Sequence, residues 1–217
     1  MCGRFSLASN LEELNNEFSS EMSSNFPAKY NISPGQNSIV ISLMKNNFYI
    51  NQIHWGFKIP KLGKLVINAR SETINDKPLF KNLLQQNRCL IPANSWFEWN
   101  KEKKPYLIKH RKKDIIAFAG LHRVEKNQER SFIIITAEAE KKLKQIHKRT
   151  PLVINKENFF SWLNYDYEKA YKFLQPINSN EYIFHPVSPK VGKISNNNMS
   201  VTEKYHGKES QLNLFSN

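Results

Sequence analysis

Hydrophobic and polar positions along the chain follow the period of a short helix first and the period of strands afterwards. The segment Ser9-Asn10-Leu11-Glu12 matches the capping-box pattern and predicts an amphipathic helix that ends at Phe18. Short β-branched or aromatic runs between polar turns then predict strands at residues 39–44, 48–53, 106–110, 115–122 and 131–136. Such a series is typical of a curved, largely antiparallel sheet.

Helical spacing returns in the second half of the chain. Ala139, Leu143 and Ile146 recur at helical intervals up to His147, and residues 159–163 and 167–174 predict two further helices. No internal repeat is present. We therefore expect an α+β fold, a single domain with a curved, largely antiparallel, barrel-like β core and flanking helices.

The length of 217 residues suits one domain, which we expect to span residues 1–195. After Val187 the composition becomes rich in Asn, Ser and Lys, so residues 196–217 are expected to form a flexible polar tail. No apolar run approaches the ~18–20 residues that span a bilayer, and no export leader is recognisable. We expect no membrane contact and a cytoplasmic location.

Composition changes this picture in two respects. Lys and Arg number 32 against 19 Asp and Glu, a net charge of +13 that predicts a polyanionic partner such as nucleic acid. An AT-rich coding sequence, which favours Lys and Asn codons, would give the same excess. The two cysteines, Cys2 and Cys89, provide neither a disulfide framework nor metal-ligand spacing, so no metal and no cofactor are expected.

Cys2 carries the most distinctive chemistry. Removal of Met1 would place an α-amine, with a reference pKa of about 7.7–8.0, and a thiol, with one of about 8.5, on the same residue. Such an aminothiol condenses with an aldehyde to an imine and then closes to a five-membered thiazolidine, a second step that gains from proximity. Acyl transfer with the thiolate as nucleophile is an alternative, and a cysteine without function at a frayed terminus is another.

Four further segments carry polar residues that a purely structural strand or helix would not need: Tyr30-Asn31-Ile32-Ser33-Pro34-Gly35, Ile67-Asn68-Ala69-Arg70-Ser71-Glu72-Thr73, Arg88-Cys89-Leu90-Ile91-Pro92-Ala93-Asn94-Ser95-Trp96-Phe97-Glu98-Trp99 and His147-Lys148-Arg149-Thr150-Pro151-Leu152-Val153. Together with the first five residues they resemble the SRAP (SOS-response-associated peptidase) family over about residues 1–195, above all its bacterial abasic-site-processing members. The resemblance implies a basic groove that leads to an N-terminal cysteine, which becomes covalently linked to single-stranded DNA at abasic sites.

The same resemblance implies a catalytic set of Cys2, Asn68, Glu98 and His147. Asn68 would position the Cys2 amine and the opened sugar. Glu98 lies between two aromatic residues, and an apolar pocket would raise its pKa and make it a proton donor. His147 would shuttle protons near neutral pH. From the residues alone, Asn68 also suits a turn, Glu98 an exposed strand face and His147 a helix C-terminus.

Contacts to DNA are implied for six further residues: Gly3, Arg4, Asn31, Pro34, Arg70 and Thr136. Arg4 and Arg70 would pair with phosphates that flank the lesion, since a guanidinium matches phosphate geometry. The chain departs from the family pattern at residues 58–64, where the bacterial relative carries a Trp that wedges between bases. Here the apolar residues are Ile59, Pro60 and Leu62, so Pro34 is expected to perform more of that role. Cys89, within an apolar run, is expected to be an inert core thiol.

Three functions remain open on this basis. The first is an enzyme with lyase-like Schiff-base chemistry that senses and traps abasic sites through Cys2. The second is an N-terminal-nucleophile amidotransferase, hydrolase or peptidase, including a thiol autopeptidase. The third is a module that binds single-stranded DNA without a covalent bond, for which the basic charge suffices.

The end of the chain adds a separate candidate. Gln211-Leu212-Asn213-Leu214-Phe215 closes an otherwise polar stretch with three large apolar residues. The segment resembles the Gln-Leu-x-Leu-Phe peptides with which bacterial repair proteins bind the replication sliding clamp. Gln211 would then bind the rim of the clamp pocket while Leu212, Leu214 and Phe215 fill it. Folding of the tail back onto the domain is the alternative.

Overall fold

The computed structural model describes residues 2–20, 26–59, 63–125, 128–164 and 166–207 of the chain. Gln211, Leu212, Leu214 and Phe215 lie outside the described residues. Part of the 58–64 loop does so as well.

A closed ring of strands forms the centre of the described structure. Its members, each hydrogen-bonded to the next, are β12 (Arg130–Glu138), β4 (Asn47–Trp55), β3 (Asn37–Met44), β8 (Arg88–Ala93) and β11 (Ile116–Val124). The ring closes because β11 also pairs with β12. Its pairs are antiparallel except β12 with β4, which is parallel. The expected barrel-like, mainly antiparallel core is confirmed.

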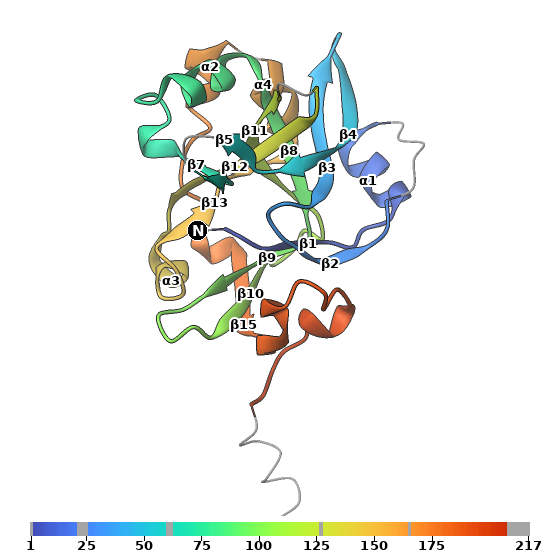
Figure 1. Ribbon diagram of the computed structural model, residues 1–217, viewed down its shortest axis with the longest axis vertical. Helices are drawn as coiled ribbons and strands as arrows, with labels where there is room; N and C mark the ends of the chain where they lie inside the picture. The colour runs from blue at the N-terminus through green and yellow to red at the C-terminus, as the bar shows by residue number, and fades with distance from the viewer. Residues whose placement is uncertain (1, 21–25, 60–62, 126–127, 165, 208–217) are drawn as a thin grey trace, which may run out of the picture.

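A second sheet lies against one end of the ring, in the lower half of Figure 1. It runs in the order β15 (Tyr182–Pro186), β10 (Pro105–His110), β9 (Ser95–Trp99), β1 (Phe5–Leu7) and β2 (Lys29–Ile32). All its pairs are antiparallel. Alternation along β9 directs Trp96 and Glu98 to the face towards the ring, while Phe97 packs with Leu107 on the opposite face.

Shorter elements complete the fold. The helices are α1 (Leu11–Phe18), α2 (Pro78–Gln86), α3 (Lys141–Lys144), α4 (Phe159–Asn164) and α5 (Tyr167–Tyr171). The short strands are β5 (Phe57–Ile59), β6 (Lys64–Val66), β7 (Asn68–Arg70), β13 (Arg149–Pro151) and β14 (Val153–Ile154). Single 3-10 turns occur at Ser71–Thr73, Lys156–Asn158, Ser179–Glu181, Pro189–Gly192 and Met199–Val201. No helix in the described part of the chain is long and apolar enough to cross a membrane.

Aromatic side chains fill the space between the ring and the second sheet. Phe5 packs on Trp55 with ring centroids 5.1 Å apart, and Trp96 meets Phe118 edge-on at 6.0 Å. Trp55, Trp96 and Phe118 are fully buried. Burial of side chains of this size is the main favourable contribution to folding. Because Phe5 belongs to this core, the first residues of the chain are held in a fixed place.

Two local expectations need correction. The capping box of α1 is formed by Asn10 and Glu13, one residue later than the Ser9 pattern predicts, because the Asn10 side chain accepts from the Glu13 N–H at 2.9 Å. The helix expected from Ala139 to His147 is a single turn, α3.

The flexible tail expected from residue 196 is also wrong for residues 196–207. Val201 is buried, the Asn197 Oδ1 accepts from the backbone N–H groups of Tyr30 and Asn31, and the Tyr205 N–H donates to the Pro186 carbonyl. Asn residues can fix a loop by such side-chain to backbone bonds, so a polar composition does not imply disorder here.

Candidate functional site

The end of β12 brings two short strands together. β7 pairs with it in parallel on one side and β13 pairs antiparallel on the other, so that Thr136 lies between Arg70 and Pro151 (Figure 1). Thr136 is fully buried, and its Oγ1 donates to the Ala69 carbonyl at 3.3 Å. It therefore fixes the spacing of the two flanking strands from within.

Cys2 and Asn68 are in direct contact. The Asn68 Nδ2 donates to the Cys2 carbonyl oxygen at 2.9 Å. Within the described residues, nothing donates a hydrogen bond to the Asn68 Oδ1, although this atom is buried. A buried acceptor of this kind is costly unless a donor reaches it, and a Cys2 amine exposed by Met1 removal would supply such a donor.

Glu98 enters the site from β9. Its carboxyl is 3% exposed, and burial raises its pKa from the ordinary 4.5 to about 7. The sequence-based expectation of a carboxyl in an apolar pocket with a raised pKa thus agrees with the structure. At neutral pH such a group is present in both protonation states, as proton transfer requires.

His147 lies beside Glu98, with its Nδ1 3.7 Å from the Glu98 Oε2. The same Nδ1 lies 3.1 Å from the Arg149 backbone nitrogen and 3.2 Å from the Arg149 carbonyl oxygen, so the Arg149 backbone holds the imidazole in place. Burial lowers the pKa of His147 below its ordinary 6.5, in the opposite direction to Glu98. A proton shared by the pair near neutral pH therefore resides on the carboxyl in preference to the imidazole.

The Cys2 side chain is fully buried. Burial, followed by the nearby Glu98 carboxylate, raises the pKa of the thiol well above its usual range. A nucleophilic cysteine of a hydrolase has the reverse property, a lowered pKa that supplies thiolate.

Arg149 and Glu72 form a connection that the sequence analysis did not assign. The Arg149 Nη1 donates to both Glu72 carboxylate oxygens at 2.8 and 2.9 Å, and its Nη2 donates to the Thr136 carbonyl. The Glu72 Oε1 also accepts from the Glu138 N–H at 2.9 Å. Both residues lie in segments that carry the family resemblance, and that resemblance was the signal that could have identified them. They tie the 3-10 turn after β7 to β13.

The structure gives Arg4 and Asn31 a different role from the expected DNA contacts. Asn31 is 2% exposed, its Nδ2 donates to the carbonyls of Val191, Lys193 and Asn196, and its Oδ1 accepts from Arg4. Arg4 also donates to the Val191 carbonyl at 2.8 Å. These side chains bind the C-terminal segment to β1 and β2.

The remaining predicted residues lie around this centre. Gly3 is half-buried beside Cys2, and Arg70 is exposed at the end of β7. Pro34 occupies a turn whose Gly35, at φ +88°, donates to the Trp55 carbonyl, and Trp55 in turn donates to the Ile67 carbonyl next to Asn68. Cys89 is buried, as expected of a core thiol.

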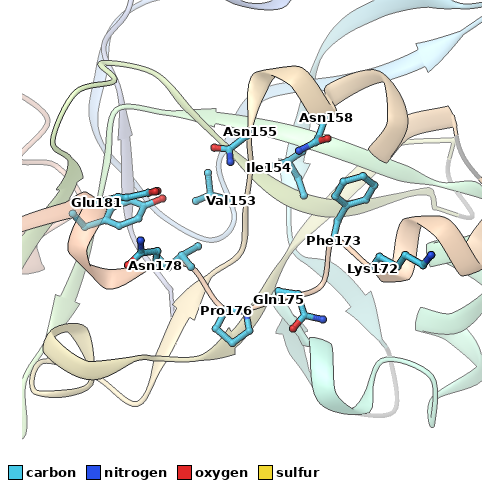
Figure 2. Close-up of a pocket in the computed structure, with 12 residues that line it drawn as sticks. Val153, Ile154, Asn155, Asn158, Lys172, Phe173, Gln175, Pro176, Asn178 and Glu181 are labelled. Carbon is cyan, nitrogen blue, oxygen red and sulfur yellow. The ribbon is translucent and has the colours of Figure 1, made fainter.

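Other hollows lie apart from this site. The hollow of about 280 Å³ in Figure 2 lies between β14, the end of α5 and the 3-10 turn before β15, and none of the predicted catalytic residues lines it. Among the described residues, no three His, Cys, Asp or Glu side chains are grouped to bind a metal ion.

Comparison with known proteins identifies the family. The model of the family "SOS response associated peptidase (SRAP)" matches residues 1–194. The chain is 32% identical to the abasic site processing protein YoqW of Bacillus subtilis over 94% of this chain and 100% of that protein. It is 30% identical to the abasic site processing protein YedK of Escherichia coli, over 90% and 96%.

Solved structures show the same fold. A crystal structure of a protein from Bacteroides thetaiotaomicron superimposes with a TM-score of 0.83 over 94% of this chain and all of that one, at 19% identity. The motifs, the fold and the extent of these matches lead to one conclusion: this chain belongs to the SRAP family.

Proposed function

We propose that this chain captures abasic sites in single-stranded DNA by forming a covalent bond through Cys2. The observation that carries the proposal is the enclosure of Cys2 by Asn68 and the Glu98–His147 pair. Relatives named abasic site processing proteins match most of the chain. The net charge of +13 suits a DNA substrate.

The reaction begins at the amine. After Met1 removal, the Cys2 amine attacks C1′ of the ring-opened deoxyribose, and the resulting carbinolamine loses its hydroxyl as water to give an imine. Glu98 in its protonated form donates the proton that this departure requires. Asn68 Oδ1 accepts a hydrogen bond from the amine and aligns it.

Ring closure follows on the same residue. The Cys2 sulfur adds to the imine carbon, the thiol proton passes to the nitrogen through Glu98 or His147, and a thiazolidine results. The raised thiol pKa supports this order, because an amine-first reaction does not need free thiolate. The same property speaks against a hydrolase that would attack a peptide with the thiolate first.

A denaturing gel tests the proposal. We expect wild-type protein to form a denaturant-resistant adduct with a single-stranded oligonucleotide that contains an abasic site, and Cys2→Ala to abolish it. Adduct from Cys2→Ala, or equal adduct with intact DNA, would refute the covalent mechanism. Intact mass of the protein shows in the same preparation whether Met1 has been removed.

Single-turnover rates at saturating protein separate the supporting roles. Glu98→Gln and His147→Ala should slow adduct formation by up to the ~10²–10⁴-fold typical of general acid–base catalysis, with little change in binding to intact strands. Arg70→Ala should instead weaken binding and reduce its salt dependence. Wild-type rates in both Glu98→Gln and His147→Ala would remove the pair from the mechanism.

A further inference from the structure

A second hollow, of about 420 Å³, lies on the face of the five-stranded sheet that points away from Cys2. Its floor contains Leu107. Leu107 pairs with Phe97 of β9, so both side chains point to the face of the sheet opposite to Glu98. Ile183 and His185 of β15 continue this floor. The hollow is thus separate from the site described above.

Cationic side chains border one side of this hollow. Residues 109–113 read Lys-His-Arg-Lys-Lys, and Lys109, Arg111 and Lys113 line the space. Asp114 is the acidic residue that lines it. Three cations against one carboxylate leave the rim positive, so it favours an anionic occupant.

The basic turn is held in a defined shape. The His110 Nδ1 accepts from the N–H groups of Lys112 and Lys113 at 3.1 and 3.0 Å. The Arg111 backbone N–H donates to the Glu181 carbonyl and its Nε to the Asn180 carbonyl, both at 2.8 Å. A rim fixed in this way loses less conformational entropy when it binds a ligand. The remaining guanidinium nitrogens of Arg111 can face an anion.

The floor and mouth are partly apolar. Leu107 and Ile183 form the floor, Tyr30 lines one side, and Met199 is 63% exposed at the mouth. Tyr30 supplies an aromatic ring on which a base can stack, and the neighbouring cations suit phosphates, which together match the needs of single-stranded nucleic acid. A purely inorganic anion would leave this apolar surface unused.

We propose that this hollow is a second contact for single-stranded DNA, which holds a nucleotide of the strand at a distance from the lesion. The inference rests on the proposed function for the choice of DNA as the occupant. Along β10, Lys109 lies three residues beyond Tyr106, the partner of Glu98, which is about 10 Å at ~3.3 Å per residue. Lys109 also faces the side of the sheet opposite to Glu98, so a strand has to pass around the edge of the sheet, and more than a few nucleotides are needed to reach both places.

The test measures binding to intact DNA, so it does not depend on adduct formation. Fluorescence anisotropy compares labelled strands of about 5 and about 20 nucleotides, one near the lower end of the ~4–16 nucleotides typical of one binding fold and one above its upper end. We expect Lys109→Ala/Arg111→Ala to weaken binding of the long strand by about tenfold and to leave the short strand unaffected. For the long strand, the slope of the logarithm of the affinity against the logarithm of the salt concentration should become less steep by about 1.4, which is ~0.7 for each lost phosphate contact on a single strand.

A matched control removes the same charge elsewhere. Lys112 belongs to the same basic run and Lys172 lies at the end of α5, and both are exposed without lining this hollow. Lys112→Ala/Lys172→Ala should leave the length dependence and the salt slope as in wild type. Lys109→Arg/Arg111→Lys, which keeps both charges, should restore binding and exclude a folding defect.

Three results would overturn the proposal. The first is an equal loss in the two double alanine variants, which would indicate only overall charge. The second is an equal loss for short and long strands. The third is an affinity for the long strand that stays unchanged when a free mononucleotide, such as dAMP, saturates the hollow. If the protein does not trap abasic DNA covalently but these effects of strand length are observed, the proposed function is refuted and the second DNA contact is not.

Discussion

At the scale of single residues, the opposed pKa values of Glu98 and His147 are the most consequential property of the site. Burial raises the first to about 7 and lowers the second below its ordinary value. Ionised Glu98 is therefore unfavourable for folding, although the same environment equips it to donate a proton. In the proposed mechanism, stability is given up at this position in exchange for reactivity.

This conflict predicts a pH-dependent gain in stability for Glu98→Gln. The carboxyl has a raised pKa in the folded state, so its contribution is fully present below about pH 4.5 and is lost as pH rises through about 7. The difference between 4.5 and about 7 corresponds to about 3 kcal/mol, at about 1.4 kcal/mol per pH unit. Glu98→Gln should approach this advantage in the free energy of urea unfolding at pH 8 and lose it at pH 4.5.

The exposed Glu102 in the turn after β9 provides the control, since Glu102→Gln should change stability little at either pH. An advantage of Glu98→Gln that is the same at pH 4.5 and pH 8 would show that the carboxyl is ionised in the folded protein throughout.

At the scale of elements, the salt bridge between Glu72 and Arg149 links the turn after β7 to β13, and both strands pair with the end of β12 at the site. β7 supplies Asn68 and Arg70, and His147 lies two residues before the start of β13. The bidentate contact joins the turn after β7 to the first residue of β13. Since side-chain placement controls the reaction rate, the contact should act on catalysis through geometry.

Glu72→Gln is therefore expected to slow adduct formation at saturating DNA by on the order of tenfold, with unchanged affinity for intact strands. Glu138→Gln is the matched control, because the Glu138 side chain pairs with Lys144 on the surface beside the same turn. An unchanged rate with a raised affinity would indicate instead that Glu72 merely competes with DNA for Arg149.

Among the elements, the long apolar strands could be predicted from the sequence and the short strands near the site could not. The long strands β3, β4, β10, β11 and β12 were predicted to within two residues at each end, since their apolar runs are continuous. β1, β2, β7, β9 and β13 were not predicted as strands, because their short segments include polar residues and lack clear alternation. These are the strands that form or adjoin the site.

Site residues divide in a similar way. The motifs identified Cys2, Asn68, Glu98 and His147, and the structure brings them together in contacting pairs. The role of Asn31 could not be predicted, since its partners Val191 and Asn196 are about 160 residues away in sequence. Contacts at such separation depend on the complete topology rather than on local pattern.

At the scale of the whole molecule, the described domain extends past the expected boundary at residue 195. Packing against the sheet continues to residue 207, with Val201 buried. The Gln-Leu-Asn-Leu-Phe segment at 211–215 follows within a few residues. We propose that it binds the replication sliding clamp, because tethering would raise the local concentration of the domain at replicated DNA without a new DNA contact.

A calorimetric titration checks this proposal. A peptide of residues 208–217 should bind purified clamp with an affinity in the micromolar range, about −8 kcal/mol, while a Leu214→Ala/Phe215→Ala peptide should give no heat. The Lys208→Ala peptide serves as a control that keeps the apolar residues. Absence of heat from the unaltered peptide at high micromolar concentration would rule the segment out as a clamp ligand.

The complete burial of Cys2 limits the time during protein synthesis in which Met1 can be removed. An aminopeptidase must hold the bond that precedes Cys2 in its own active site, whereas Cys2 is fully buried in the folded domain. Residues 147–149 and 191–196, which close the structure around the first strand, leave the ribosome late. At ~5–20 residues per second, their synthesis follows that of Cys2 by roughly 10–40 s. We therefore expect Met1 removal, which the proposed function requires, to take place in that interval, before the domain has closed around Cys2.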